Sequence, residues 1–525
     1  MDALQIGIFL FISAAIGWLT YLSCRNAPSG DRGSDHDYFL ANGGLSWYFV
    51  AGSITLTNLS TDQLVGMNGN QMLLLAWWEL AAVVGLLILA YVFIPIYYRN
   101  NCTTTTELLQ RKYDNKHIRA LISVLFLLGN LFIFLPAILY GGSLFLKSTT
   151  GADFFAVFGE RLFVGTAIEV DSTILIMSIA FAVVGALYAI LGGLRAVAVS
   201  DTYSGVLILS LAILVVVLAL NAINWDFSGI PAERMDMFIG NRLEDGSETP
   251  IPWHTLLTGM IFIQIFYWST NQTITQRAMA SPSVEEARKG ILAAAGIRLL
   301  IVPVIVVLPG VVAFKLYGDV GDAAYGMIVG DILPPALSGA FAAALAAAVL
   351  TTFNSILNAS AALYVCDVHE PYIDKARDVP KLSMYVSIAM TLLAIFLVPI
   401  YASQESIINT VQQLYGLLSM PILSAFIVGL AFRNVSAWAA IIGVVTGVFV
   451  YAVFSFKIYA VLGVSLDVGL GATLSSVHYI HYMFFTLLVS IGTALLSNLI
   501  VFQRRAELTI WSSDQKAELS AESEL

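Results

Sequence analysis

Apolar stretches of about 20 residues, separated by short polar connections, follow one another along the whole chain. An α-helix of this length matches the ~30 Å hydrocarbon core of a bilayer. On this criterion we expect about thirteen membrane-spanning helices, and therefore an all-α polytopic membrane protein. The predicted spans are residues 3–23, 46–68, 76–98, 118–146, 173–192, 196–222, 253–278, 290–317, 336–365, 381–401, 406–432, 436–457 and 477–503.

Two of these spans are interrupted by polar residues in the middle. The second contains SITLTNLSTDQLVGMNGN (residues 53–70), and the seventh contains FYWSTNQTITQR (residues 266–277). Ser60 to Gln63 fits a capping box, which marks a helix start inside the second span. Because backbone polar groups in the bilayer need partners, a helix breaks only where protein or water surrounds the break. A polar stripe that joins neighbouring helices is the alternative interpretation.

The positions of the two interruptions predict an internal repeat. Spans 2 and 7 lie an odd number of spans apart, so the second is inverted relative to the first. Paired interruptions of this kind indicate inverted repeats with a binding site at the bilayer midplane. We expect five parts: a peripheral helix and cytoplasmic loop (1–45), a first repeat of helices 2–6 (46–222), an extracellular loop (223–252), a second repeat of helices 7–11 (253–432), and two peripheral helices with a cytoplasmic tail (433–525).

Composition and charge agree with a membrane protein. The chain is 58% hydrophobic and 11% charged, whereas soluble proteins carry about 25% charged residues. If the N-terminus lies outside, most Lys and Arg residues, Arg277 among them, fall in cytoplasmic loops, as the positive-inside rule requires. We therefore expect a multi-pass protein of the plasma (inner) membrane, with the N-terminus outside, the C-terminus in the cytoplasm and no nucleic-acid partner.

An enzyme, a channel and a transporter-like sensor are the competing classes. The six histidines and three cysteines show no spacing typical of metal ligands. Only the loop 34–37 (Ser-Asp-His-Asp) offers candidate catalytic groups, and such a short charged loop is more typical of a solvated connection. The sequence therefore predicts no enzyme activity.

Charged residues within the spans mark candidate functional positions, because each costs a few kcal/mol at the centre of the bilayer. They are Asp62, Glu79, Asp201 and Arg298. Glu79 follows Trp77 and Trp78, and aromatic rings beside a carboxylate suit a sugar, although such tryptophans also form interfacial belts. Arg298 would pair with a carboxylate, contact a substrate or extend toward the interface. Asp201 would assist the exit of an ion or cap a helix.

The ninth span carries a pair of hydroxyl groups in an alanine-rich helix. Small residues allow another helix to approach closely, and Thr351 and Thr352 lie beside Ala348. Hydroxyl and carbonyl oxygens without a carboxylate suit a hard monovalent cation such as Na⁺. Threonines in spans also bond to the carbonyls of their own helix, which is the alternative.

Several blocks of the sequence resemble the solute:sodium symporter family, and within it the bacterial sodium/galactose-type sugar symporters. The blocks are DYFLANGGLSW, TNLSTDQLVGMNG, GGLRAVAVSD, YWSTNQTITQRAMASPSVEEARKG, VLPGVVAF and AAALAAAVLTTFNSILNAS, and the similarity extends from about residue 37 to 432. The resemblance implies a leucine-transporter-type fold with a 5+5 inverted repeat. It also implies alternating access and uptake of a sugar coupled to Na⁺.

The resemblance also implies a set of binding residues. The sodium site would contain the Leu56 and Leu59 carbonyls with Ala348, Thr351 and Thr352, and Asp201 would assist sodium release. The substrate would contact Gln63, Glu79, Gln264 and Arg298, with Asn58 and Trp78 nearby, Tyr267 as the inner gate and Gln412 in the tenth core helix.

Departures from the family pattern leave the substrate open. Gln264 and Arg298 replace an Asn and a Lys that are common in the family, Ala82 replaces a Ser, and Phe134 stands where the family has an Asn. Gln63 with Glu79 favours a neutral polyhydroxy ligand, because buried polar groups need hydroxyl partners. Arg298 keeps an acidic sugar, such as a uronate or sialic acid, or another small polar solute as the alternative. The sodium stoichiometry and the oligomeric state stay open.

Overall fold

The computed structural model describes residues 3–509 except 26–38, 41–42, 60, 151–158, 167–168, 375–377, 405, 459–466, 470–471 and 474–476. It describes only the backbone of residues 3, 24–25, 62, 150, 188–196, 467–469 and 472–473. Ser60 of the predicted capping box, the loop 34–37 and the tail from residue 510 lie outside the described residues.

The first half of the chain forms a series of helices with a few short π-helical and 3-10 turns. They are α1 (Ala3–Arg25), α3 (Trp47–Asn58), α4 (Thr61–Leu64), α5 (Gly66–Gly69), η2 (Leu73–Ala76), α6 (Trp77–Ile88), η3 (Leu89–Phe93), α7 (Ile94–Arg99), α8 (Thr105–Tyr113), α9 (Lys116–Gly129), η4 (Asn130–Phe134), α10 (Leu135–Thr150) and α11 (Ser172–Ala222).

The second half continues the same pattern. Its elements are α12 (Ala232–Met235), η6 (Trp253–Leu257), α13 (Gly259–Thr270), α14 (Gln272–Met279), α15 (Val284–Leu300), α16 (Val302–Tyr317), η7 (Gly321–Ala323), α17 (Ala324–Ile332), α18 (Pro335–Tyr364), η8 (Val365–His369), α19 (Glu370–Tyr372), α20 (Val379–Ala402), α21 (Ile407–Ala431), α22 (Ala437–Ser455) and α24 (Tyr479–Ile500).

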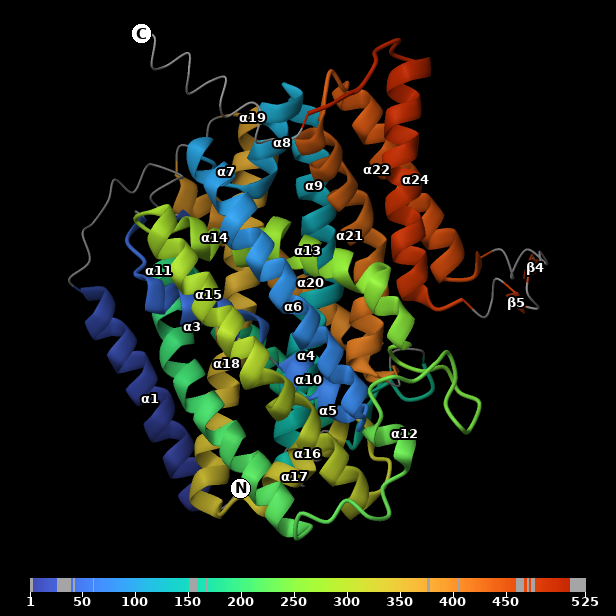
Figure 1. Cartoon of the computed structure of the whole chain (residues 1–525). Helices are drawn as coiled ribbons and strands as arrows, with labels where there is room; N and C mark the ends of the chain where they lie inside the picture. The colour runs from blue at the N-terminus through green and yellow to red at the C-terminus, as the bar shows by residue number, and fades with distance from the viewer. Residues whose placement is uncertain are drawn as a thin grey trace.

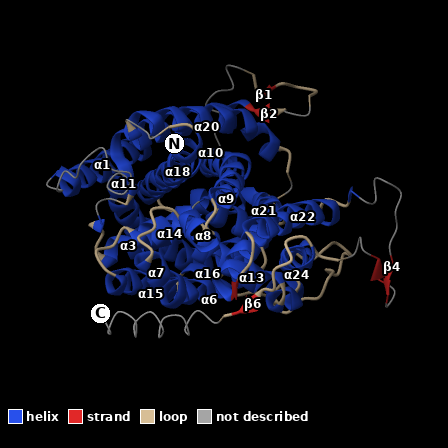
Figure 2. Ribbon diagram, turned by 90° about the horizontal axis from the view of Figure 1, so that it is seen from above, coloured by secondary structure: helices blue, strands red, loops and turns tan. Residues whose placement is uncertain are grey.

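The strands are short, and they lie in the segments between the helices. Three antiparallel pairs occur in the described residues: β1 (Arg161–Leu162) with β2 (Val170–Asp171), β3 (Phe432–Arg433) with β6 (Glu507–Leu508), and β4 (Asp467–Gly469) with β5 (Ala472–Thr473). The molecule is a helical bundle in which α1 lies at one edge and α22 and α24 lie at the opposite edge (Figures 1 and 2).

The apolar helices match the predicted spans. Within the described part of the chain, 10 helices are long and apolar enough to cross a bilayer, and residues Ser172–Leu187 form a shorter apolar helix. The two predicted spans that remain, 46–68 and 253–278, are the two with polar interruptions. Neither forms a single helix of spanning length, because each is divided into shorter helices.

The predicted spans 173–192 and 196–222 both lie within α11, in which Val197–Ala222 is long and apolar enough to cross a bilayer and Ser172–Leu187 forms a shorter apolar helix. The backbone is helical from Ser172 to Ala222, a segment of 51 residues. A span needs about 20 residues, so the 51 residues of α11 are enough for the two predicted spans. The segment contains no proline, the residue that most strongly ends a helix.

Both predicted helix breaks are confirmed. In the second span, α3 ends at Asn58, and Leu59 leaves the helical region with φ −76° and ψ 65°. In the seventh, α13 ends at Thr270, and Asn271 is extended with φ −71° and ψ 122°. The Asn271 side chain accepts a hydrogen bond from the Thr273 backbone N–H at 2.9 Å and so caps the start of α14.

Close helix packing brings the two breaks into one region. The span of α18 is the most buried, with 78% of its apolar window inside the protein, and other helices surround it in the view from above (Figure 2). Gly85 of α6 faces α13, where an added Cβ would lie 2.7 Å from Trp268 Cδ1 and closer still to the Gln264 carbonyl. Only glycine allows this approach, which places α6 against the second broken helix.

Candidate functional site

A polar cavity lies beside the two breaks. The space inside it that is open to water-sized groups is about 40 Å³. The lining residues are Asn58, Gln63, Trp78, Glu79, Ala82, Phe134, Ile263, Gln264, Tyr267, Trp268, Val411, Gln412 and Tyr415. The structure therefore brings together all the residues predicted to bind substrate, with the exception of Arg298.

Tyr267 separates this cavity from a second one. The Asn58 Nδ2 group donates a hydrogen bond to the Tyr267 hydroxyl at 3.0 Å. The second cavity, of about 20 Å³, is lined by Thr57, Asn58, Phe134, Ile138, Tyr267, Asn271, Thr273, Thr352 and Ile356. Because Asn58, Phe134 and Tyr267 line both cavities, the Tyr267 ring stands between them, as an inner gate would.

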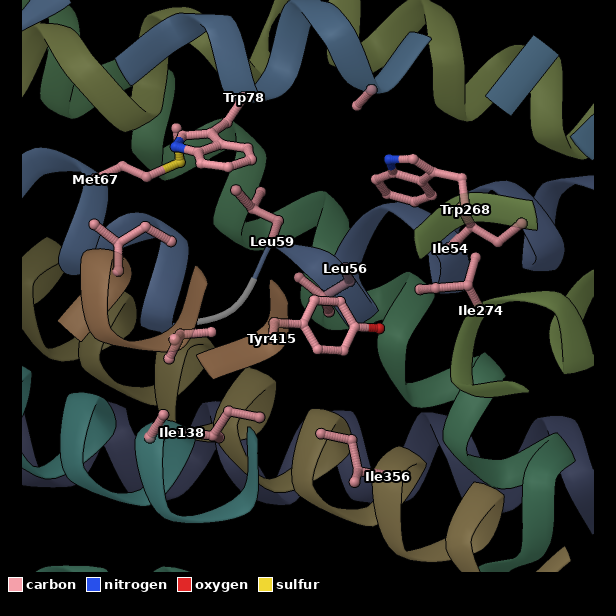
Figure 3. Close-up of a cluster of buried hydrophobic side chains, with 14 of the residues drawn as sticks. Ile54, Leu56, Leu59, Met67, Trp78, Ile138, Trp268, Ile274, Ile356 and Tyr415 are labelled. Atoms are coloured by element: carbon pink, nitrogen blue, oxygen red, sulfur yellow. The ribbon is translucent and has the colours of Figure 1, made fainter. Parts of the chain in front are cut away.

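Aromatic rings enclose the region of the first break. Figure 3 shows Trp78, Trp268 and Tyr415 around the end of α3, where Leu56 and Leu59 lie. The Trp268 and Tyr415 rings lie 5.1 Å and 6.0 Å from the Tyr267 ring, each in an edge-to-face arrangement. Trp268 and Tyr415 were not predicted from the sequence. The aromatic content of FYWSTNQ is a signal that could have indicated Trp268.

Arg298 stands behind the cavity, in an ion pair with Glu79. The side chains are 0% and 1% exposed, so Arg298 does not extend to the interface. Gln63 Nε2 donates to the second Glu79 oxygen at 2.6 Å. The Arg298 guanidinium also donates to the Thr55 carbonyl at 3.3 Å and lies 4.4 Å from the Trp268 ring centre. Pairing with a carboxylate is thus the interpretation that the structure shows, and the cationic charge is neutralised within the protein.

The amide groups in the cavity fall into two kinds. Gln264 is held between the tryptophans, since its Nε2 donates to the Trp78 carbonyl at 2.8 Å and its Oε1 accepts from Trp268 Nε1 at 2.9 Å. In contrast, Asn58 Oδ1 and Gln63 Oε1 are buried acceptors with no partner among the described residues. Two acceptors of the cavity therefore remain for the hydroxyl groups of a ligand.

Trp77 has a different role from its neighbour Trp78. Its Nε1 donates to the Met237 carbonyl at 2.8 Å, and its ring lies 5.6 Å from that of Phe238. Trp77 therefore holds the 223–252 loop, and only Trp78 of this pair lines the cavity.

The two predicted sodium-site hydroxyls have different environments. Thr351 Oγ1 donates to the carbonyl of Ala348 in its own helix at 3.2 Å, which is the ordinary behaviour of threonine in spans. Thr352 Oγ1 is buried without a partner among the described residues, and it lines the second cavity with Thr57 and Asn58 next to the first break. An unpaired hydroxyl facing a broken helix suits a cation that prefers oxygen ligands. The set with the Leu56 and Leu59 carbonyls stays a prediction.

Asp201 belongs to a buried network that the sequence did not indicate. It lies inside α11 rather than at a helix start, and it accepts hydrogen bonds from Ser53 at 2.7 Å and Thr57 at 3.4 Å. Arg277 Nη2 lies 3.9 Å from Asp201, and both side chains are 0% exposed. Arg277 Nε also donates to Ser53 at 2.8 Å.

The expectation that Arg277 lies in a cytoplasmic loop is therefore wrong. Burial of its charge is compensated by the carboxylate of Asp201. A basic residue at the inner end of a broken span is the signal that could have revealed this pair.

Two broken helices beside a polar cavity, within a bundle of apolar helices, are the arrangement typical of secondary transporters. A model of the sodium:solute symporter family matches residues 38–447. The chain belongs to this family.

Relatives of known sequence align with this chain over most of its length and over most of their own. The chain is 32% identical to the uncharacterized symporter YidK of Escherichia coli K12 over 472 residues, which are 87% of this chain and 80% of that protein. It is 27% identical to the sodium/glucose cotransporter of Vibrio parahaemolyticus, over 85% of this chain and 84% of that protein. It is 25% identical to the sodium/myo-inositol cotransporter 2 of Mus musculus, over 92% of this chain and 75% of that protein.

Solved structures show the same fold. A Na⁺-coupled sialic acid symporter in its substrate-bound outward-open state matches with a TM-score of 0.75 and 15% identity, covering 97% of this chain and 100% of that chain. Mhp1, a nucleobase-cation-symport-1 family transporter in a closed conformation, matches with a TM-score of 0.53 and 13% identity. This match covers 90% of this chain and 96% of that chain. The predicted leucine-transporter-type fold is confirmed.

Proposed function

We propose that the protein carries a neutral sugar or related polyhydroxy solute into the cell together with Na⁺ by alternating access. One observation supports the choice of solute most strongly. Asn58 Oδ1 and Gln63 Oε1 are unpaired acceptors in the cavity, whereas the charge of Arg298 is neutralised by Glu79. Hydroxyl groups satisfy such acceptors, but a carboxylate would meet no lysine or arginine among the described lining residues.

The relatives support the same class of solute. Two of them are a sodium/glucose cotransporter and a sodium/myo-inositol cotransporter, and glucose and inositol are both neutral and rich in hydroxyl groups. An acidic sugar is the alternative, as in the sialic acid symporter with the same fold. It would require Arg298 to leave Glu79 and enter the cavity.

Sodium would bind between the first break and α18. The proposed ligands are the carbonyls of Leu56, Leu59 and Ala348 with the hydroxyls of Thr351 and Thr352. A bound cation there would join the two proposed repeats, 46–222 and 253–432, in the outward-open form. When the solute fills the cavity above Tyr267, the half-helices tilt, the second cavity opens toward the cytoplasm, and Na⁺ leaves past Asp201. The N-terminus would lie outside and the C-terminus in the cytoplasm.

The sodium gradient supplies enough free energy for this function. A membrane potential of ~100 mV contributes about 2.3 kcal/mol per charge, and a tenfold gradient adds about 1.4 kcal/mol. One sodium ion per solute would thus sustain accumulation of a few hundredfold, on the order of 3.7 kcal/mol.

Uptake into proteoliposomes tests the proposal. Radiolabelled glucose, galactose and myo-inositol would each be offered with an inward Na⁺ gradient or an equal K⁺ gradient, beside glucuronate and sialic acid as acidic solutes. We expect uptake of a neutral solute only with Na⁺. Uptake of an acidic sugar alone would contradict the choice of solute. Uptake that is equal in K⁺, or sodium current that needs no solute, would contradict symport.

A further inference from the structure

Three of the chain's six histidines lie near one another in the fold, although their spacing in the sequence does not show it. His254 belongs to η6, which leads into α13, the first half of the second broken helix. His478 precedes α24 and His481 lies in its first turn. The two elements touch here, because an added Cβ at Gly259 would clash with the Ile480 carbonyl. The histidines thus lie where the first half of the second broken helix meets α24.

His254 and His481 are linked directly by their ring nitrogens. His481 Nε2 lies 2.7 Å from His254 Nδ1, and the rings are 4.7 Å apart and nearly parallel. His481 Nδ1 lies 2.9 Å from Thr258 Oγ1. The Thr258 hydroxyl itself donates to the Thr255 carbonyl at 3.2 Å.

One tautomer of His481 prepares it to bind a metal ion. When the Thr258 hydroxyl donates to Thr255, its oxygen accepts from His481 Nδ1–H. In that tautomer the lone pair of His481 lies on Nε2 and points toward His254. Metal-ligating histidines are oriented in the same way, with one ring nitrogen donating to a protein acceptor and the other facing the ion.

The pair needs little change to hold a metal ion. Histidine nitrogens lie about 2.0–2.1 Å from Zn²⁺ in tetrahedral sites, so two of them stand about 3.3–3.4 Å apart. The His254–His481 separation would increase by roughly 0.6 Å to reach that value. His254 would transfer its proton from Nδ1 to Nε2 through solvent, which leaves the net charge of the ring unchanged. Both rings are half-buried and so remain accessible.

The neighbouring groups determine how many protein ligands the metal ion would have. His478 is buried, and its Nδ1 accepts from the Ile480 backbone N–H at 3.4 Å, so it serves as a helix cap. No group of three His, Cys, Asp or Glu side chains in the described residues could hold a metal ion. Water would therefore complete the coordination, as expected for weak and reversible binding.

We propose that His254 and His481 form a binding site for a transition-metal dication such as Zn²⁺, which joins η6 to α24 and inhibits transport. Imidazole ligands select Zn²⁺, Cu²⁺ or Ni²⁺ over Mg²⁺ and Ca²⁺. Inhibition follows because a cross-link between these elements opposes the tilt of α13. The inhibitory effect rests on the proposed function, whereas metal binding itself does not.

Calorimetric titration of the purified full chain, without an affinity tag, with ZnCl₂ tests the site at pH 7.5. We expect saturable binding of one ion per chain, lost in His254→Ala and in His481→Ala. The matched control is His117→Ala, since His117 pairs with Tyr372 at 2.6 Å elsewhere in the molecule. Thr258→Val keeps both ligands but removes the orienting contact, and should weaken binding about tenfold or more. Mg²⁺ should give no binding.

Two outcomes would overturn the metal site: no saturable binding, or binding that both His254→Ala and His481→Ala retain. Thermal unfolding without Zn²⁺ shows whether each variant is folded, and Thr258→Val supplies an independent test. In proteoliposomes, Zn²⁺ should lower Na⁺-driven uptake several-fold in the natural chain but not in His254→Ala. Unchanged uptake with Zn²⁺ bound would overturn the inhibitory effect. If no solute is taken up at all, the proposed function fails while calorimetry still decides the metal site.

Discussion

Asn58 and Tyr267, which are 209 residues apart in the sequence, are joined by a hydrogen bond of 3.0 Å. Asn58 is the last residue of α3 before the first break, and Tyr267 lies in α13 just before the second break. The bond therefore connects the two broken helices directly. It also lies at the boundary between the two cavities, so movement of either half-helix would open or close the passage between them.

Substitution of Tyr267 tests this gate. Tyr267→Phe removes the hydrogen bond but keeps the ring, and a typical bond of this kind contributes about 1 kcal/mol. We expect a modest loss of uptake, on the order of fivefold. Tyr267→Ala removes the ring and joins the two cavities, so solute accumulation should collapse. Accumulation by Tyr267→Ala at the level of the natural chain would show that Tyr267 is not the gate.

The unpaired hydroxyl of Thr352 provides a test of the sodium site. Thr352→Ala removes that oxygen and should abolish Na⁺-dependent uptake without reducing expression, whereas Thr352→Ser keeps the oxygen and should retain uptake. The measurement is the dependence of initial uptake rate on Na⁺ concentration in proteoliposomes. Expression and folding are checked by size-exclusion chromatography. Full sodium-driven uptake by Thr352→Ala would place the cation elsewhere.

The ion pair of Arg298 with Glu79 should contribute to stability as well as to the shape of the cavity. Arg298→Met leaves the Glu79 charge buried without a cation, which costs about 3–5 kcal/mol in comparable cases. We expect a clear fall in the unfolding temperature, largely restored in the double variant Glu79→Gln with Arg298→Met. Lys289→Met on the same helix breaks only an exposed ion pair with Glu286 and serves as the control. If Arg298→Met lowered the unfolding temperature no more than Lys289→Met does, a buried pair of Arg298 with Glu79 would be contradicted.

Asp322 predicts a dependence of stability on pH. It lies in η7, outside the membrane-spanning helices, and accepts a hydrogen bond from the Ile407 backbone N–H at 2.9 Å. Burial raises the pKa of this carboxyl from 3.8 to about 7. The folded state thus binds the proton more tightly than the unfolded state. Its contribution to stability is complete below pH ~4 and is lost as the pH rises through ~7.

Removal of the Asp322 charge should remove this dependence. Asp322→Asn should unfold at a higher temperature than the natural chain at pH 8 and at a similar temperature at pH 4 or below. The gain is at most about 4 kcal/mol, and smaller because the side chain is only half-buried. Asp319→Asn, at an exposed neighbouring position, is the control. A constant difference between Asp322→Asn and the natural chain across this pH range would contradict the raised pKa.

The sequence predicted the features that depend on local chemistry. The break in the seventh span was predicted from the polar residues of segment 266–277, and in the structure Asn271 caps α14 there. The contacts between distant residues were not predictable in this way. Arg277 and Asp201 are 76 positions apart, and only the packing of both α14 and α11 against α3 brings their charges together. Likewise, nothing in the local sequence shows that Gln264 is held between two tryptophans.

The proposed function requires that the two breaks build one site in which solute and Na⁺ bind together. A thermal-shift measurement on the purified protein, with neutral sugars and sugar acids in Na⁺ or in K⁺ at equal ionic strength, tests it most directly. We predict that a neutral sugar raises the unfolding temperature in Na⁺ and leaves it unchanged in K⁺. Equal stabilisation by that sugar in both salts, or stabilisation by acidic sugars alone, would contradict the account.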